Sequence, residues 1–190
     1  MLNKIFIISL IFTSSISLFA SNDGAIIHGQ KHFFSIAMPA GWVFNKKACQ
    51  EYGLPHLIQP KDRINEIQTC IYANGFDRKE GSNLTINDFI RDEQISFKNK
   101  APFVKINKLN ITFSNIQKTK LLSGNYCIYE LTGFPNKYKE LIIYIDAIET
   151  VCTIVFSTKT EEDYNKYYQD YISIVKSFRF LGRNVNTNIK

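Results

Sequence analysis

Several residue patterns that identify enzymes and nucleotide-binding proteins are missing from this sequence of 190 residues. It has no GxSxG turn of the kind that carries a hydrolase serine, and no phosphate-binding loop of the GxGxxG or Walker type. Histidine is scarce, with three residues in the whole chain, and no CxxC pair is present to indicate a zinc or redox site. The sequence therefore predicts no catalytic residue, no metal ligand and no cofactor.

Long apolar runs are also missing after residue 20. The first 20 residues place Lys4 before an apolar core, and Leu18-Phe19-Ala20 fits a cleavage site before Ser21. Serines interrupt the apolar core, which favours a cleaved signal peptide over a permanent membrane span. Because residue 21 is serine and not cysteine, a lipoprotein anchor at this site is not supported. We therefore expect an exported protein, periplasmic or secreted, with no transmembrane span in the mature chain.

The positive charge of the chain is modest and dispersed. The formal net charge is +6, and no compact basic cluster is visible among the lysines between residues 98 and 120. A nucleic-acid-binding domain needs a basic patch or a recognisable module. Since neither is visible, we expect no nucleic-acid partner, although the charge is compatible with weak attraction to an acidic surface such as anionic lipid.

All four cysteines, Cys49, Cys70, Cys127 and Cys152, follow the predicted signal peptide. An even number of cysteines in an exported chain suggests two disulfides. We favour Cys49–Cys70, because the two are close in sequence and their loop would contribute about 3 kcal/mol by chain entropy. In a simple meander Cys127 and Cys152 would lie two strands apart, about 10 Å, which is too far for a bridge. Either the strand order differs and they pair, or they are free buried thiols.

The histidines give only weak support for a site. His28 and His32 have a spacing that suits a metal only on a helix, yet they border a predicted strand. A zinc site or a Cys–His nucleophile can be imagined at His56, but a disulfide between its cysteine neighbours is the better interpretation. An exported hydrolase whose residues meet only in three dimensions would draw on His56, Cys49, Cys70 and Glu51.

Two long helices are predicted from apolar spacing. Residues 160–178 repeat apolar side chains in steps of three and four on one face: Tyr164, Tyr167, Tyr168, Tyr171, Val175 and Phe178. A second helix is predicted over residues 85–99, where Thr85 and Asp88 fit a capping box. Asn83 and Asn110 each begin a glycosylation sequon, and the sequence leaves open whether either is used.

Strand patterns fill most of the remaining chain. Residues 126–132, 140–146 and 149–157 read as an antiparallel meander that is apolar on both faces, and such strands need cover on both sides. We therefore predict an α+β fold in which a central antiparallel sheet carries helices on both faces. The other strands are expected within residues 32–44, 64–73, 104–112 and 115–122. The predicted organisation is a signal peptide at 1–20, a lead-in at 21–31, one domain at 32–181 and a flexible tail at 182–190.

Three features follow one another along the chain. The first is Phe34-Ser-Ile-Ala-Met-Pro-Ala-Gly-Trp42, the second is the meander, and the third is Ile174-Val-Lys-Ser-Phe178 at the end of the last helix. In this order they resemble the PsbP-like superfamily, which includes photosystem PsbP, Ran-binding Mog and periplasmic DcrB-type proteins. The resemblance covers residues 32–181. It implies an α-β-α sandwich, and it supplies no catalytic residue, because function varies widely within the superfamily.

The predicted function is an exported, non-catalytic binding or assembly module. We expect a protein partner, bound through sheet edges or through loops such as residues 77–83 and 46–61. The first alternative is a carrier of an apolar ligand or a membrane-surface protein, motivated by the many tyrosines and phenylalanines and by the positive charge. The second alternative is the exported hydrolase described above.

Overall fold

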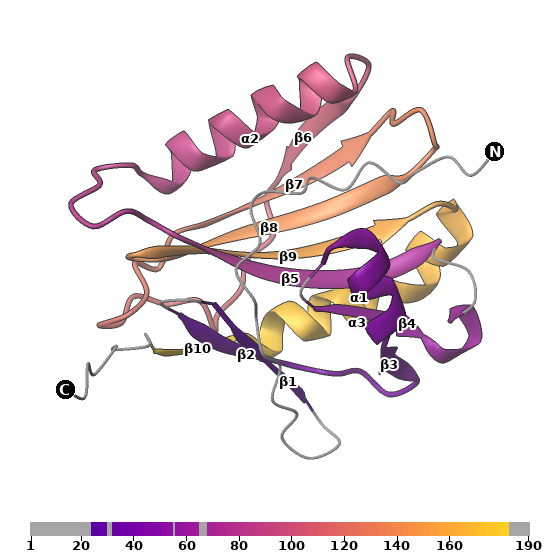
Figure 1. Ribbon diagram of the computed structural model, residues 1–190, viewed down its shortest axis with the longest axis horizontal. Helices are drawn as coiled ribbons and strands as arrows, with labels where there is room; N and C mark the ends of the chain where they lie inside the picture. Colours follow the sequence, from indigo (N-terminus) through magenta and orange to yellow (C-terminus); the bar gives the residue numbers. More distant parts are fainter. Residues whose placement is uncertain (1–23, 30–31, 55, 65–67, 183–190) are drawn as a thin grey trace.

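The computed structural model (Figure 1) describes residues 24–29, 32–54, 56–64 and 68–182. The predicted signal peptide and residues 183–190 of the predicted tail lie outside these ranges. The described residues form three α-helices and two antiparallel sheets. None of these helices combines the length and the apolar character that crossing a bilayer requires.

The main sheet has seven strands in the order β3-β4-β5-β9-β8-β7-β6, and every neighbouring pair is antiparallel. Its strands are β3 Trp42–Phe44, β4 Leu57–Pro60, β5 Thr69–Asp77, β6 Lys105–Leu109, β7 Tyr126–Thr132, β8 Lys139–Ala147 and β9 Thr150–Thr158. The predicted meander is confirmed, because β7, β8 and β9 are consecutive neighbours. Every residue of β9 is buried, as expected for a strand covered on both faces.

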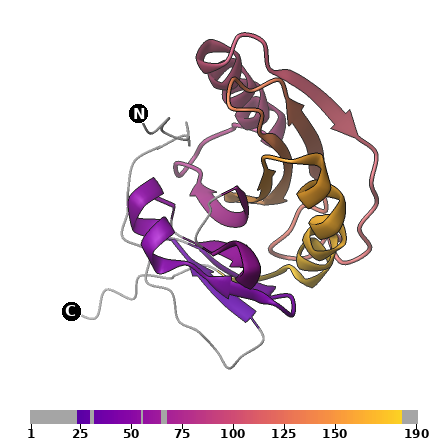
Figure 2. The same cartoon turned by 90° about the vertical axis from the view of Figure 1, so that its right-hand side faces the viewer.

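A helix lies against each face of the main sheet, as predicted (Figures 1 and 2). On one side, here called the α3 face, helix α3 (Glu161–Ser177) buries Tyr167, Tyr171 and Val175 against the sheet. On the opposite side, the α2 face, helix α2 (Ile86–Lys100) packs Ile90 and Phe97 over β8 and β9. The α+β architecture with helices on both faces therefore follows from the two amphipathic stripes.

A second, three-stranded sheet was not predicted. It has the order β1-β2-β10, with β1 Gly24–His28, β2 Phe33–Ala37 and β10 Arg179–Gly182. Strand β1 lies where the sequence indicates only a polar lead-in. Inward residues of this sheet, among them Ile27 and Phe34, pack with α3 and the main sheet in one core. The two ends of the domain are joined in this way, because β1 and β10 both pair with β2.

Two other segments differ from the sequence-based prediction. The mixed region 45–63 contains a short helix α1 (Lys46–Tyr52), capped by Asn45, which accepts a hydrogen bond from the Ala48 amide. Residues 115–122, predicted as a strand, form a loop on the α3 face. Ile116 and Leu122 anchor this loop in the core, and the Asn115 side chain donates to the Val175 carbonyl at 3.0 Å. The apolar residues there hold a loop in place rather than line a strand.

Candidate functional site

The predicted Cys49–Cys70 disulfide is not formed, since all four cysteines are free thiols. Both residues belong to the apolar cluster between α1 and the sheet. The Cys49 sulfur accepts a hydrogen bond from the Leu57 amide at 3.2 Å, while Cys70 is buried on β5. Burial raises the pKa of both thiols. Closeness in sequence placed the two residues in one cluster but did not determine where their sulfur atoms point.

Cys127 and Cys152 are also free, for a geometric reason. Cys127 pairs with Tyr144 across β7 and β8, whereas Cys152 pairs with Ile145 across β8 and β9. Consecutive residues of a strand point to opposite faces. Cys127 therefore lies on the α2 face and Cys152 on the α3 face, so that the sheet itself separates the two sulfur atoms.

The three histidines lie close enough for His28 and His32 to act on His56, a grouping that their sequence positions did not indicate. His32, directly before β2, lies against β5, where its Nδ1 is 2.7 Å from the Asp77 carboxylate. A Cβ added at Gly75 would lie 2.2 Å from the His32 ring, so that only glycine fits there. His56 reaches the same region because its carbonyl accepts a hydrogen bond from the Ala73 amide of β5 at 3.2 Å.

His56 is held neutral at the centre of this histidine cluster. It is 4% exposed, and neither ring nitrogen has a hydrogen-bond partner among the residues that the structure describes. Burial is the main cause that lowers the pKa of His56 to about 4, with smaller contributions from His28 and His32. Within the described residues, no three His, Cys, Asp or Glu side chains are arranged to hold a metal ion. His56 is thus a buried, neutral member of the cluster, whereas His32 is paired with Asp77.

A Cys–His–Asp order also appears at this place, but it cannot act as a nucleophilic triad. Cys152 pairs with Gly75, over which the His32 ring lies, and His32 is bonded to Asp77 in turn. The Cys152 side chain is 0% exposed, and burial raises the pKa of its thiol far above the ordinary value. A nucleophilic cysteine needs access to substrate and a thiolate, and this residue has neither.

The α2 face holds a pair of glutamates that the sequence analysis missed. Glu140 of β8 accepts a hydrogen bond from the Ser157 hydroxyl at 3.1 Å. Burial raises its pKa to about 7, with a further contribution from the charge of Glu93 on α2. Burial also raises the pKa of Glu93, and one of its carboxylate oxygens is buried with no hydrogen-bond partner in the described part of the chain. With a pKa of about 7, Glu140 can gain and lose a proton near neutral pH.

Tyrosines surround the two glutamates. Tyr72 lies on β5, two strands from β8, and the Tyr144 hydroxyl is hydrogen-bonded to Glu93. Burial raises the pKa of both phenols, so that they stay neutral beside the carboxylates. A signal for this glutamate–tyrosine cluster was present in the sequence, because Glu140 directly precedes the apolar run 141–145 of β8.

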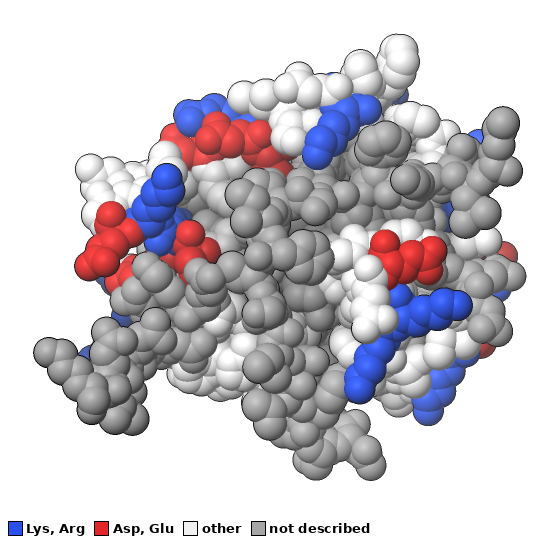
Figure 3. Space-filling view, in the orientation of Figure 1, with Lys and Arg blue, Asp and Glu red and all other residues white. Residues whose placement is uncertain are grey.

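Positive charge is concentrated along the free edge of the main sheet. From residue 94 to residue 129 the sequence contains six lysines and no aspartate or glutamate. This segment includes the end of α2 and the strand β6, which has a neighbour on one side only and forms the outer edge in Figure 2. By contrast, basic and acidic side chains lie next to one another over much of the described surface seen in Figure 3.

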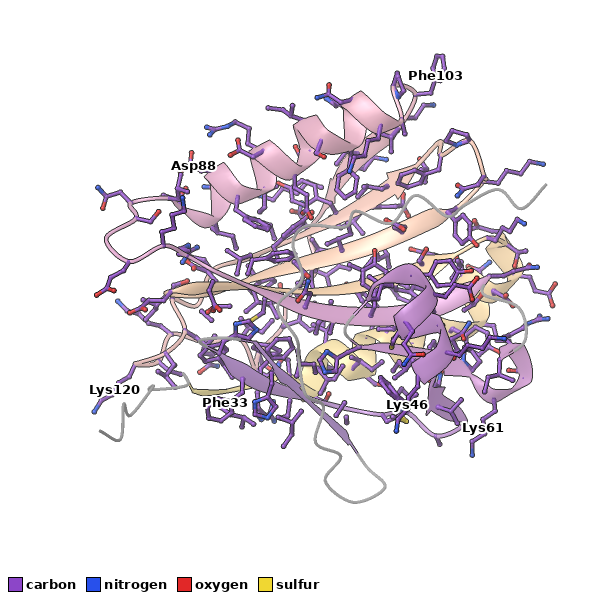
Figure 4. The ribbon with its side chains drawn as sticks, viewed as in Figure 1. Phe33, Lys46, Lys61, Asp88, Phe103 and Lys120 are labelled. Atoms are coloured by element: carbon purple, nitrogen blue, oxygen red, sulfur yellow. The ribbon has the colours of Figure 1, made fainter. Side chains whose placement is uncertain are left out.

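One corner of this edge combines lysines with an exposed aromatic ring. We call it the basic tip, and it consists of Lys98, Lys100, Phe103, Lys105 and Lys137. Phe103 is 83% exposed and points away from the molecule (Figure 4). The loop that contains Lys137 lies beside it, since a Cβ added at Gly133 would meet the Phe103 carbonyl at 2.6 Å. All four lysines are exposed, and none pairs with a carboxylate of the described residues. Lysines that look dispersed in the sequence are therefore partly gathered in space.

Comparison with known proteins supports the fold. No model of a known protein family matches this chain, and no curated protein is similar to it in sequence. Among solved structures it is similar to the solution structure of cyanobacterial PsbP (CyanoP) from Synechocystis sp. PCC 6803. The TM-score is 0.50 at 13% sequence identity, over 90% of this chain and 95% of that one. This likeness shows the PsbP-like fold alone, and a resemblance to Mog or DcrB-type proteins stays a prediction.

Proposed function

We propose that this chain is an exported, non-catalytic binding or assembly module that attaches to an acidic partner through its basic tip. The observation that carries the proposal is the exposed Phe103, 83% accessible to solvent and flanked by lysines that have no acidic partner among the described residues. Exposed apolar groups next to uncompensated charge mark interaction surfaces. In a PsbP-like fold, whose members differ in function, such a surface carries more information than the fold itself.

Structural roles explain some of these lysines but not the whole tip. Lysine on an edge strand prevents unwanted sheet pairing, and this accounts for Lys105. Cations near the C-terminus of a helix are favoured by the helix dipole, and this accounts for Lys98 and Lys100. Neither effect accounts for a phenylalanine that projects into solvent, because exposing its ring forgoes about 2 kcal/mol of burial free energy.

The hydrolase alternative now depends on a different set of residues. The thiols of Cys49 and Cys70 have raised pKa values, and His56 is buried, so that these residues give it little support. The Glu93–Glu140 pair favours it instead, because a carboxyl with a pKa of about 7 is suited to general acid–base catalysis. Such an activity would be lost in both Glu140→Gln and Glu93→Gln, and it would not depend on the basic tip.

Two experiments test the proposal. The first determines the N-terminus of the mature protein, and the second captures a binding partner from the native cell envelope. The expected mature N-terminus is Ser21, which mass spectrometry of the protein from its own host identifies. For capture, a tip variant replaces Lys98, Lys100, Lys105 and Lys137 with serine. A control variant with the same net charge replaces four exposed lysines elsewhere, namely Lys118, Lys120, Lys159 and Lys176.

We expect the wild type and the control variant to retain the same partner, and the tip variant to lose it. Equal retention by all three proteins would refute binding through the tip. A chain that keeps its first 20 residues and stays in the cytoplasm would refute export. Circular dichroism of the three proteins establishes that a lost partner does not reflect a lost fold.

A further inference from the structure

We infer that the acidic partner of the basic tip is the surface of an anionic lipid bilayer, with Phe103 entering the region between headgroups and acyl chains. This inference rests on the proposed function and names its partner. It is argued from how the structure displays Phe103, from the charge around it, and from the composition and size of the tip.

The turn that carries Phe103 is firmly anchored. The Val104 amide donates to the Ala101 carbonyl at 2.9 Å, which closes a four-residue turn with Pro102 and Phe103 at its apex. Ala101 and Val104 are 7% and 6% exposed, while the ring between them is 83% exposed. Proline at the second position pre-sets the backbone of such a turn. The chain therefore buries both anchors of the turn and presents the phenylalanine outward.

The lysines of the tip come from three segments that meet near the turn of Phe103. Lys98 and Lys100 belong to the last turn of α2, Lys105 to the start of β6, and Lys137 to the β7–β8 connection. Lysine side chains are long and flexible, so that their ammonium groups can adjust to a charged surface. In the view of Figure 3, the acidic side chains of α2 lie farther back along the helix, toward its N-terminus.

The acidic residues of the neighbouring strands do not neutralise the tip. Glu130 of β7 is engaged on the α3 face, where Lys139 lies 3.2 Å away and the Tyr164 hydroxyl 3.4 Å away. Glu140 accepts from Ser157 on the α2 face, and its pKa of about 7 leaves it only partly charged. The tip therefore presents an uncompensated positive charge around an apolar centre.

Composition and size favour a lipid surface over a protein surface. The core of a protein interface is depleted in lysine and enriched in arginine and in aromatic residues, phenylalanine included; the tip has one phenylalanine, but it has four lysines and no arginine. A stable protein interface also needs about 20–30 residues on each side, more than one projecting corner supplies. Lysines around an inserted phenylalanine suit the interface of an anionic membrane.

Vesicle co-sedimentation tests this inference. The purified protein is mixed with vesicles of phosphatidylcholine alone, or with about one-third phosphatidylglycerol, at low and at high salt. Every variant has the same N-terminus, so any contribution of the predicted signal peptide is common to all of them. The proteins compared are the wild type, the tip variant, the control variant and Phe103→Ser.

We expect binding to the anionic vesicles that falls with added salt. Each lysine near an anionic surface strengthens binding about five-fold, so the tip variant should bind at least about 100-fold more weakly. Phe103→Ser should bind the anionic vesicles at least about ten-fold more weakly than the wild type does. The control variant should bind them about as strongly as the wild type. In Phe103→Trp, brominated lipids should quench the fluorescence of the added indole. Trp42 is 3% exposed, so that the wild type, which has only this tryptophan, gives the background quenching.

The outcomes separate this inference from the proposed function. The lipid inference is overturned if the tip and control variants bind vesicles equally well. It is also overturned if brominated lipid does not quench the indole in Phe103→Trp. If the wild type does not bind anionic vesicles but captures an envelope protein in a tip-dependent way, the lipid inference fails and the proposed function stands. If binding depends on the tip neither for vesicles nor for an envelope protein, the lipid inference and the proposed function both fail.

Discussion

His56 and Glu140 are buried titratable residues whose pKa values move in opposite directions. Burial lowers the pKa of His56 to about 4 and raises that of Glu140 to about 7. In both cases the charged form is disfavoured, because a charge loses its hydration on leaving water. The two residues therefore make opposite contributions to the pH dependence of stability, and each contribution can be isolated by one substitution.

The wild type should lose stability in acid because of His56, and the variant His56→Leu should lose less. The imidazole of the unfolded chain takes up a proton near pH 6.5, while the folded protein resists protonation down to about pH 4. Acidification between these values therefore favours the unfolded state by up to about 3 kcal/mol. Urea unfolding at about pH 7 and pH 4.5 should show a smaller acid loss in the variant than in the wild type. An identical acid loss in both proteins would mean that His56 is not the buried neutral group described here.

Glu140→Gln should act at the other end of the pH range. The pKa of Glu140 in the folded protein is about 7, above the ordinary value of 4.5. The contribution of Glu140 to the free energy of unfolding is therefore fully present below about pH 4.5, where the carboxyl is protonated in both states. It is lost as the pH rises through 7. The variant should therefore be more stable than the wild type by about 3 kcal/mol at pH 8, and nearly equal to it at pH 4.5. The matched control is Glu162→Gln, at an exposed position, where urea unfolding should show no such dependence on pH.

The sequence allowed some of these residue properties to be predicted. Glu140 stands on a strand whose apolar pattern already required cover on both faces, so that its burial could have been inferred. The histidine cluster could not, because His28 and His32 belong to the small sheet and His56 to the segment before β4. The absence of the Cys49–Cys70 bridge likewise depends on side-chain directions within one cluster, which sequence separation does not determine.

At the scale of elements, the helices were predicted well because their signals are local. Helix α3 spans Glu161–Ser177, within one residue of the predicted 160–178 at each end. Helix α2 begins after Thr85 with the expected capping box. Strands β1 and β10 were missed because each is short and is stabilised by pairing with β2, a contact between distant parts of the chain.

Thr160→Ala should weaken the start of α3. The Thr160 hydroxyl accepts a hydrogen bond from the Asp163 amide at 3.1 Å, and losing such a cap costs about 1 kcal/mol. The Asp163 carboxylate, which accepts from the Thr69 hydroxyl at 2.6 Å, ties the same turn to β5. Urea unfolding should show a lowered midpoint for this variant and little change for the neighbouring Lys159→Ala. Equal midpoints for the two variants would contradict a stabilising cap.

At the scale of the whole molecule, the sheet covered by two helices followed from the sequence, whereas the basic tip did not. The meander and the two amphipathic helices were enough to predict the main layers, because the sheet has two apolar faces and one helix was available to cover each. The basic tip joins the end of α2, the start of β6 and the β7–β8 connection. Since Lys98 and Lys137 are distant in the sequence, their proximity depends on the order of the strands.

The central proposal is that this protein binds a partner through the lysines and the exposed phenylalanine of its basic tip. The most direct test is the amount of protein retained by the native envelope fraction at physiological salt. The wild type is compared with the tip variant and with the control variant of equal net charge. The account predicts that the control variant is retained like the wild type and that the tip variant is washed away. Retention of the tip variant at the level of the control variant would contradict it.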